Sequence, residues 1–292
     1  MKLFLLLCLP FIIIEVNAQE KKIVDQLATY EPPVDSLDGW KFKGLTSFNL
    51  GQTSLTNWAA GGENTVSINA VLNATANYRK KYWYWENSLN IEYGVVYSTS
   101  RKWKKSTDKI NLTSIGGRDI SKHWSGSVLI NFNTQFSKGY ELPDSTRYIS
   151  TFMAPGYLDG AIGFSYKPND KYSVFLSPLA ERMTFVLNDS LSNTGAFGVD
   201  PGKKVKWETG AFILASSNQT LATNLTLIST LDLFTSYNKD FGNVKMNWNL
   251  LLNYKFNKLF SASLNTTLRY YDQEVKQIQF KEIFGLGITL SL

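Results

Sequence analysis

The fold is decided by residues 278–292, which read Ile278-Gln-Phe-Lys-Glu-Ile-Phe-Gly-Leu-Gly-Ile-Thr-Leu-Ser-Leu292. Every second residue from Ile278 is apolar except Glu282, and the residues between them are mostly small or polar. Successive side chains of a β-strand point to opposite faces, so this alternation is typical of a strand between an apolar and a polar environment. The stretch therefore predicts a long amphipathic strand.

The same alternation recurs along most of the chain from Trp40 onward. It predicts about twelve strands, and an even number is typical of barrels in bacterial outer membranes. The expected strands lie near residues 42–50, 66–78, 83–97, 108–116, 124–136, 158–166, 172–179, 205–213, 221–237, 244–256, 260–270 and 278–292.

The composition agrees with a β-protein that contacts lipid. Of the 292 residues, 14% are aromatic and only 18% are charged, and Asn, Ser and Thr are frequent. Membrane barrels place aromatic residues at the two interfaces and small polar groups inside. The length fits one large β-domain or two ordinary ones.

The first residues are expected to be a secretory signal peptide. Lys2 precedes an apolar run over residues 3–14, and Val16-Asn-Ala18 is a small-residue cleavage site. Residues 1–18 would be removed together with Cys8, which leaves an exported chain without disulfides. The net charge stays at +6, because 30 minus 24 becomes 29 minus 23 when Lys2 and Glu15 are removed.

Residues 19–39 are polar, contain Pro32-Pro33 and show no period, so we expect a short periplasmic tail before a barrel over residues 40–292. No later apolar run approaches the ~18–20 residues of a spanning helix. A secreted chain of this kind is either a soluble β-protein or a barrel that crosses the membrane with strands.

The connections favour the membrane barrel. Short turns, for example at residues 79–81, 216–220 and 257–258, alternate with longer loops such as 98–107, 138–155 and 181–204. Short periplasmic turns and long outer loops are typical of outer-membrane barrels. A soluble lipocalin-like barrel would instead point its uninterrupted apolar face inward. We therefore predict an all-β fold, a transmembrane antiparallel β-barrel in the cell outer membrane.

Two resemblances support this prediction. The end of the chain, from Gly285 to Leu292, resembles the C-terminal signal by which outer-membrane barrels are recognised for insertion. The segments at residues 40–64, 172–179 and 188–202, with the stretch 195–202 as the most specific part, resemble a Bacteroidetes-type family of outer-membrane proteins that is a domain of unknown function. The resemblance implies fold and location, and it supplies neither an activity nor a catalytic residue.

The candidate functional residues are polar side chains on the expected inward face. They line a solute path in one interpretation and pair across a crowded lumen in the other. Eight-stranded barrels are filled and those of sixteen strands are open, so twelve strands indicate a narrow or occluded path. The lumen-lining candidates are Asn69, Asn73, Glu86, Glu92, Asp159, Lys206, Glu208, Asp232 and Arg269, and Lys281 shares this face.

An enzymatic interpretation rests on His123 and Ser125, which would share one face of a strand within hydrogen-bonding reach. The outer-membrane phospholipase uses a similarly spaced pair that faces lipid, whereas these two residues lie on the inward face. We therefore expect no catalysis. With one histidine and no mature cysteine, a metal site built from these residues is excluded. Carboxylates in the loop 181–204 permit a Ca²⁺ site without implying one, and we expect no cofactor.

The expected partners are outer-membrane lipid, small solutes and other envelope proteins. The basic run 101–105 is placed in an outer loop, where it is solvated or contacts anionic headgroups. Nucleic acid is not expected, because export removes it from reach. The leading hypothesis is a narrow pore or binding barrel for small solutes. The alternatives are an occluded structural or assembly partner and, third, a lipid-active enzyme.

The loop 181–204 carries many apolar residues for a solvated loop, among them Met183, Phe185, Leu191 and Phe197. Exposing each large apolar side chain is unfavourable by roughly 1.5–3 kcal/mol. We therefore expect residues 183–187 to extend the preceding strand and the remainder to fold over or into the barrel mouth.

Overall fold

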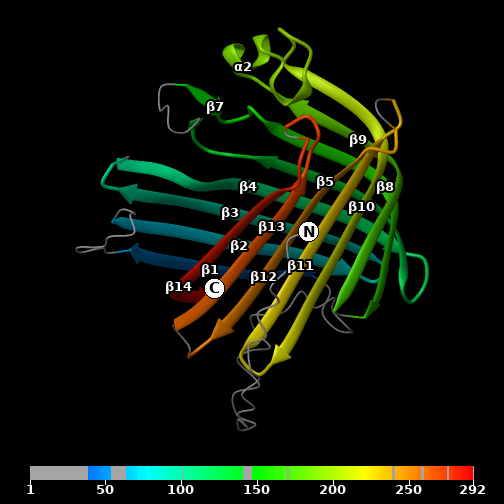
Figure 1. Cartoon of the computed structure of the whole chain (residues 1–292). Coiled ribbons are helices and arrows are strands. Elements are labelled where there is room, and N and C mark those ends of the chain that lie inside the picture. Colours follow the sequence, from blue (N-terminus) through cyan, green and yellow to red (C-terminus); the bar gives the residue numbers. More distant parts are fainter. Residues whose placement is uncertain are drawn as a thin grey trace, which may run out of the picture.

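Twelve long antiparallel strands close into a barrel, as the alternation predicts (Figure 1). The computed structural model describes residues 39–53, 64–100, 102–140, 147–169, 171–238, 241–257, 260–274 and 276–291. The predicted signal peptide and nearly all of the predicted tail lie outside the described residues. Around the ring the strands follow the chain, except that two short strands stand apart from the barrel.

The barrel strands in ring order are β1 (Gly39–Thr53), β2 (Thr65–Lys80), β3 (Trp83–Ser98), β4 (Lys102–Asp119), β5 (Trp124–Thr134), β8 (Gly156–Asn169), β9 (Tyr172–Phe185), β10 (Val205–Ala222), β11 (Leu225–Ser236), β12 (Val244–Lys255), β13 (Phe260–Tyr270) and β14 (Gln279–Ser291), which pairs with β1. The separate pair is β6 (Gly139–Tyr140) and β7 (Tyr148–Ser150).

The apolar faces of the strands point out of the barrel. On β14, Phe280, Phe284 and Leu286 are 62%, 64% and 52% exposed. Other strands repeat this pattern, with exposed Leu50 on β1 and Ile68 on β2. So much apolar surface is unfavourable in water and is satisfied by lipid. Among the described residues, no helix is long and apolar enough to cross a membrane.

The closing seam between β14 and β1 depends on glycine. The seam pairs Leu50 with Leu286 at one end and Leu45 with Ser291 at the other. A Cβ atom on Gly287 would overlap the carbonyl oxygen of Phe48, which is fixed backbone. The alternation in the last strand therefore supplies both an apolar outer face and the close approach that closes the ring.

Several strands are longer than the alternation suggests. β10 continues to Ala222, so the turn before β11 lies at residues 223–224, and the predicted turn at 216–220 is wrong. These polar residues still pair, with Ser216 opposite Thr230 and Thr220 opposite Thr226. Backbone hydrogen bonds stabilise a strand even where its side chains are polar. Such a strand shows no alternation of apolar residues, so the sequence pattern does not predict it.

The predicted loop 98–107 is also too long. β4 begins at Lys102, and Lys104 and Lys105 pair with Val96 and Val95. The basic run is therefore mostly strand and not loop. A register shift at Gly94 and Val95 accompanies this extension, and such bulges interrupt the two-residue period on which the sequence prediction depends.

The described residues of the loop after β9 are ordered, as predicted. Residues 183–185 extend β9, and the chain then forms α2 (Asp189–Asn193) and the 3-10 helix η1 (Ala196–Gly198). Val186, Leu191 and Val199 are buried together with Ala154 of the neighbouring loop. We call residues 186–204 the cap. It lies at one end of the barrel in Figure 1, here called the cap end, and the turns at 81–82 and 223–224 lie at the opposite turn end.

One side of the barrel interior is filled. Leu129, Phe175, Phe212 and Phe234 form a buried apolar cluster together with Ala161 and Ala180. These residues come from β5, β8, β9, β10 and β11, so this half of the wall encloses a core. The packed apolar side chains leave little room for a solute on this side of the interior.

Candidate functional site

Two groups of buried ion pairs lie beside this apolar core. Arg182 on β9 faces Asp159 on β8, with its Nε 2.5 Å and its Nη2 3.1 Å from the two carboxylate oxygens. Both side chains are 3% exposed. The guanidinium also lies 4.5 Å from the ring centre of Phe234. A bidentate pair of this kind fixes two strands rigidly.

The second group centres on Glu208 of β10. Its carboxylate accepts hydrogen bonds from Lys245 at 2.7 and 2.8 Å, and Lys206 lies 3.2 Å away. Gln273, in the loop after β13, donates to the same carboxylate at 3.3 Å. Asp232 accepts from Asn247 at 2.8 Å. Four of the predicted lining residues therefore satisfy one another and their neighbours on the filled side.

Contacts across the lumen narrow the cap end. The hydroxyl of Tyr157 on β8 donates to Glu274 at 2.6 Å, and Arg269 on β13 donates to the same carboxylate at 2.6 Å. The guanidinium of Arg269 lies 4.2 Å from the ring centre of Tyr271. Burial raises the pKa of the Tyr271 hydroxyl to about 12, so this ring stays neutral beside the cation.

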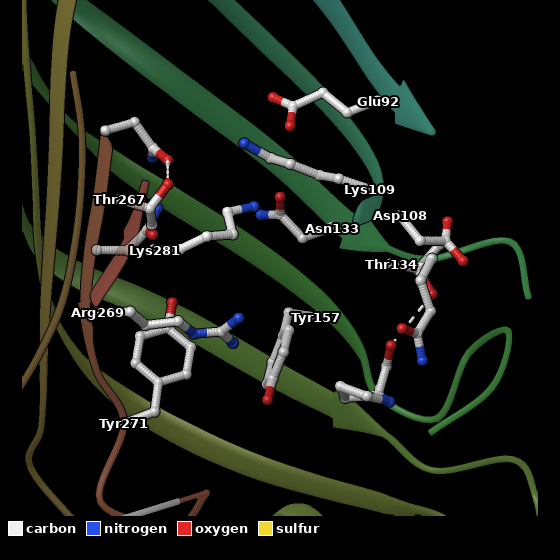
Figure 2. A pocket seen from close by; sticks show the side chains of 14 residues that line it. Glu92, Asp108, Lys109, Asn133, Thr134, Tyr157, Thr267, Arg269, Tyr271 and Lys281 are labelled. Carbon is white, nitrogen blue, oxygen red and sulfur yellow. Dashed lines mark hydrogen bonds between the residues drawn. The ribbon is translucent and has the colours of Figure 1, made fainter. Parts of the chain in front are cut away.

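A cavity of about 190 Å³ lies between these bridges and the amide-lined half of the wall (Figure 2). Its lining comes from strands on both sides of the barrel, including Asn133 of β5, Tyr157 of β8 and Asn249 of β12. Glu92, Lys109, Arg269 and Lys281 bring charge to it. The cavity is smaller than the ~300–1,000 Å³ of drug-sized pockets, so it suits a small solute.

Lys281 crosses this cavity. It starts on β14, and its Nζ reaches the hydroxyl of Thr107 on β4 at 3.4 Å. Three strands, β1, β2 and β3, separate β14 from β4 around the ring, so the side chain spans the lumen instead of following the wall. The open part of the lumen is therefore no wider here than one lysine side chain and its contacts.

At the turn end, Lys167 of β8 lies across the lumen from Glu86 of β3 and donates at 2.6 and 2.7 Å. Between the two ends the wall is rich in amides. Asn73 accepts from Asn90, and Asn111 donates at 2.8 Å to both Asn131 and Asn133. Asn69 lies in the same inward phase as Asn73, and its Oδ1 is buried without a hydrogen bond to a described residue.

The structure thus separates the predicted lining residues. Glu92 and Arg269 border the cavity, and Glu86 bridges the turn end. Asn69 and Asn73 belong to the amide wall. Asp159, Lys206 and Glu208 belong to the buried ion pairs, and Asp232 accepts a hydrogen bond from Asn247.

Sequence reasoning missed Lys109, Arg182 and Lys245. Lys245 lies between Val244 and Met246, which are assigned to the outward apolar face. The alternation therefore places Lys245 on the inward face, and this residue could have been predicted. The register of β9 is irregular near Pro178, which precedes Arg182. Before this point the odd-numbered residues Phe175 and Ser177 face inward, and after it the even-numbered residues Ala180 and Arg182 do. Because the alternation changes here, the sequence predicts a strand that ends at residue 179, and the second half of β9 is not recognised.

The geometry of His123 and Ser125 does not form a dyad. Ser125 donates to Asp119 at 2.8 Å, and the His123 Nδ1 lies 3.2 Å from the carbonyl oxygen of Lys167. In the described part of the chain, no group of His, Cys, Asp and Glu side chains has an arrangement that could hold a metal ion. Two carboxylates of the loop 181–204 already have partners: Glu181 accepts a hydrogen bond from Thr209, and Asp189 forms an ion pair with Lys204.

A closed, even-numbered antiparallel barrel with an apolar outside and a polar or charged inside is the architecture of outer-membrane proteins. The chain is therefore an outer-membrane β-barrel protein with a narrowed lumen. Its strands cross the membrane, so lipid is the environment of the outer face.

Residues 50–140 match a family described as "Protein of unknown function (DUF3078)". The predicted resemblance to a family of unknown function is thereby confirmed over this part of the chain. The matched range includes the end of the early segment, residues 50–64, whereas residues 172–179 and 188–202 lie outside it. The Bacteroidetes-type origin stays a prediction. No curated protein was found to match the chain by sequence.

Several solved structures are similar in architecture. An outer membrane channel from Pseudomonas putida F1 is 12% identical, with 90% of this chain and 97% of that chain covered and a TM-score of 0.42. The translocator domain of the autotransporter NalP from Neisseria meningitidis is 9% identical, with coverages of 94% and 93% and a TM-score of 0.39. The NanC porin is 8% identical, with coverages of 85% and 97% and a TM-score of 0.39. At these values the likeness concerns the barrel architecture alone.

Proposed function

We propose that the protein is a narrow pore or binding barrel for small polar solutes. The observation that carries this proposal is the cavity of about 190 Å³, which is lined by side chains from opposite walls of a closed barrel. A barrel that only anchors other proteins has no need of a polar cavity, because packed side chains stabilise it better than an unfilled space.

The amide-rich wall is the route that fits such a solute. Asparagine offers both hydrogen-bond donors and acceptors without a net charge. Asn111, Asn133 and Asn249 face the same half of the lumen, and Thr267 donates to Asn249 at 3.0 Å. A hydroxylated solute that moves along this wall can replace its hydrogen bonds to water with hydrogen bonds to these side chains.

The bridges restrict the route to small molecules. Tyr157 with Glu274 narrows the cap end, Lys281 crosses the middle of the open half, and Lys167 with Glu86 narrows the turn end. Passage then depends on movement of these flexible side chains, while the apolar core and the buried ion pairs hold the wall in place. The protein should therefore conduct weakly and exclude large solutes.

The test is conductance in planar bilayers together with swelling of liposomes that contain the purified protein. We expect small single-channel currents, and swelling with monosaccharides but not with trisaccharides. A tight barrel that gives no current and no swelling, and that binds no small solute, would contradict this proposal. Stable co-purification with other envelope proteins in that case would support the structural partner, the alternative that the filled half of the interior favours.

A further inference from the structure

We propose that the cavity selects a small monoanion with a hydroxylated body, such as a sugar acid, and that Lys109 and Lys281 bind its carboxylate. This inference rests on the proposed function, because it names the class of solute for the same cavity. It is drawn from the position of the two amino groups and from the balance of charge around them.

The two lysines enter the cavity from two strands that are not neighbours in the ring. Lys109 belongs to β4 and Lys281 to β14, and Figure 2 shows their side chains extending toward each other across the space. Lys281 makes one long contact, 3.4 Å to Thr107. Within the described part of the chain, the amino group of Lys109 takes part in no hydrogen bond or ion pair. Both ammonium groups are thus available to an anion that enters between them.

The other charges of the cavity are already compensated. Asp108 accepts from Lys105 at 3.0 Å and from the backbone N–H groups of Phe136 and Ser137 at 2.7 and 2.8 Å. Arg269 is paired with Glu274 at 2.6 Å.

Glu92 is the remaining carboxylate of the cavity lining, and it is paired across the strands with Lys109 in the β3–β4 register. It is 5% exposed, and no described residue makes a hydrogen bond or an ion pair with its carboxylate. Two lysines against one glutamate leave an excess of one positive charge. A monoanion neutralises this excess, whereas a dianion or a cation would leave uncompensated charge between the walls of a narrowed lumen, which is costly.

Neutral groups surround the rest of the space. Asn133, Asn247 and Asn249 provide donors and acceptors, and Thr267 adds a hydroxyl group. These groups suit hydroxyls, because each hydroxyl can donate one hydrogen bond and accept others. A purely apolar acid would leave the amides without hydrogen bonds, so the body of the solute should be polar.

The test uses glucuronate and glucose, two rings of similar size that differ in one carboxylate. Binding of each sugar is measured by calorimetry on the purified full-length barrel in detergent. We expect glucuronate to bind about tenfold more tightly or better, since a charge-assisted hydrogen bond is stronger than a neutral one. Lys109→Gln and Lys281→Gln should each reduce this preference, and the double variant should abolish it. Equal affinity for the two sugars, or a preference that survives in the double variant, would overturn the inference.

Lys255→Gln is the matched control, because Lys255 lies in the inward phase of β12 at the turn end and does not line the cavity. Its preference for glucuronate should equal that of the unmodified protein. Every variant is first checked for a folded barrel by its gel mobility before and after heating, and Lys→Met variants serve if a glutamine variant does not fold.

A salt-gradient measurement separates this inference from the proposed pore. The reversal potential should indicate anion preference, and the double lysine variant should lose that preference while it still conducts. Conductance without glucuronate preference would retain the pore and overturn the monoanion site. Glucuronate binding that depends on the two lysines, without any conductance, would retain the site as that of a binding barrel and overturn the pore.

Discussion

The Nζ of Lys281 on β14 lies 3.4 Å from the hydroxyl of Thr107 on β4, although three strands separate β14 from β4 around the ring. One lysine side chain is therefore long enough to span the open half of the lumen at this level. Because the contact is long and the lysine side chain is flexible, it narrows the path without sealing it. The lumen is divided into a rigid, filled half and a polar half that side chains can open.

Removing the bridge at the cap end should widen the path. Tyr157→Ala deletes the ring that contacts Glu274 and Arg269, so single-channel conductance should rise while the barrel stays folded. Tyr237→Ala is a suitable control, because Tyr237 is exposed and its hydroxyl donates to the carbonyl of Pro178 instead of to the cavity. Unchanged conductance in Tyr157→Ala would show that the narrowest point lies elsewhere.

The cap should limit conductance if it restricts the mouth. Gly198 of the cap lies against Gln273, which donates to Glu208 inside the barrel. Replacing residues 189–201 with a short flexible linker should therefore raise conductance. In the unmodified protein the cap should resist protease, because its apolar residues are buried with Ala154. Ready cleavage within the cap of the folded protein, with unchanged conductance on deletion, would exclude this role.

Breaking the buried pair of Asp159 and Arg182 should strongly destabilise the barrel. Asp159→Asn removes the carboxylate that accepts both hydrogen bonds of the buried guanidinium, and the expected loss in unfolding free energy is about 3–5 kcal/mol. Urea unfolding in lipid vesicles measures it. Asp189 and Lys204 form an exposed ion pair in the cap, so Asp189→Asn should cost no more than about 1 kcal/mol. A small loss for Asp159→Asn would show that the pair is not needed for stability.

Closure of the ring should depend on Gly287. Gly287→Val places a branched side chain against the Phe48 carbonyl, so the seam should not form and the band that shifts on heating should disappear. Gly160 in β8 has open space where a Cβ would be, and Gly160→Ala should preserve the shift. A normal heat-dependent shift in Gly287→Val would mean that the seam tolerates a wider spacing.

The orientation in the membrane follows from loop length. The cap end should face the outside and the turn end the periplasm. A cysteine placed at Asp200, which is exposed in the cap, should react with an impermeant maleimide on intact cells. A cysteine at Lys80, at the end of β2, should react only after the membrane is opened. The reverse pattern would overturn this orientation.

The sequence by itself determined the barrel. The two-residue period in residues 278–292 and its recurrence fix strand type and facing, because a strand exposes alternate residues to lipid and lumen. The same period placed Glu92 and Arg269 on the inward face. It failed where polar residues continue a strand, as at 216–220, and where a bulge near Pro178 reverses the phase.

Only the tertiary structure decided which inward residues form the site. Facing is a local property of one strand, whereas pairing depends on ring order, register and strand tilt. Asp159 and Glu92 are equivalent in the sequence pattern, but Arg182 neutralises the first, while the second borders a cavity with Lys109. The contact between Lys281 and Thr107 joins residues far apart in the chain, and it exists because closure of the barrel makes β14 and β4 face one lumen with only three strands between them.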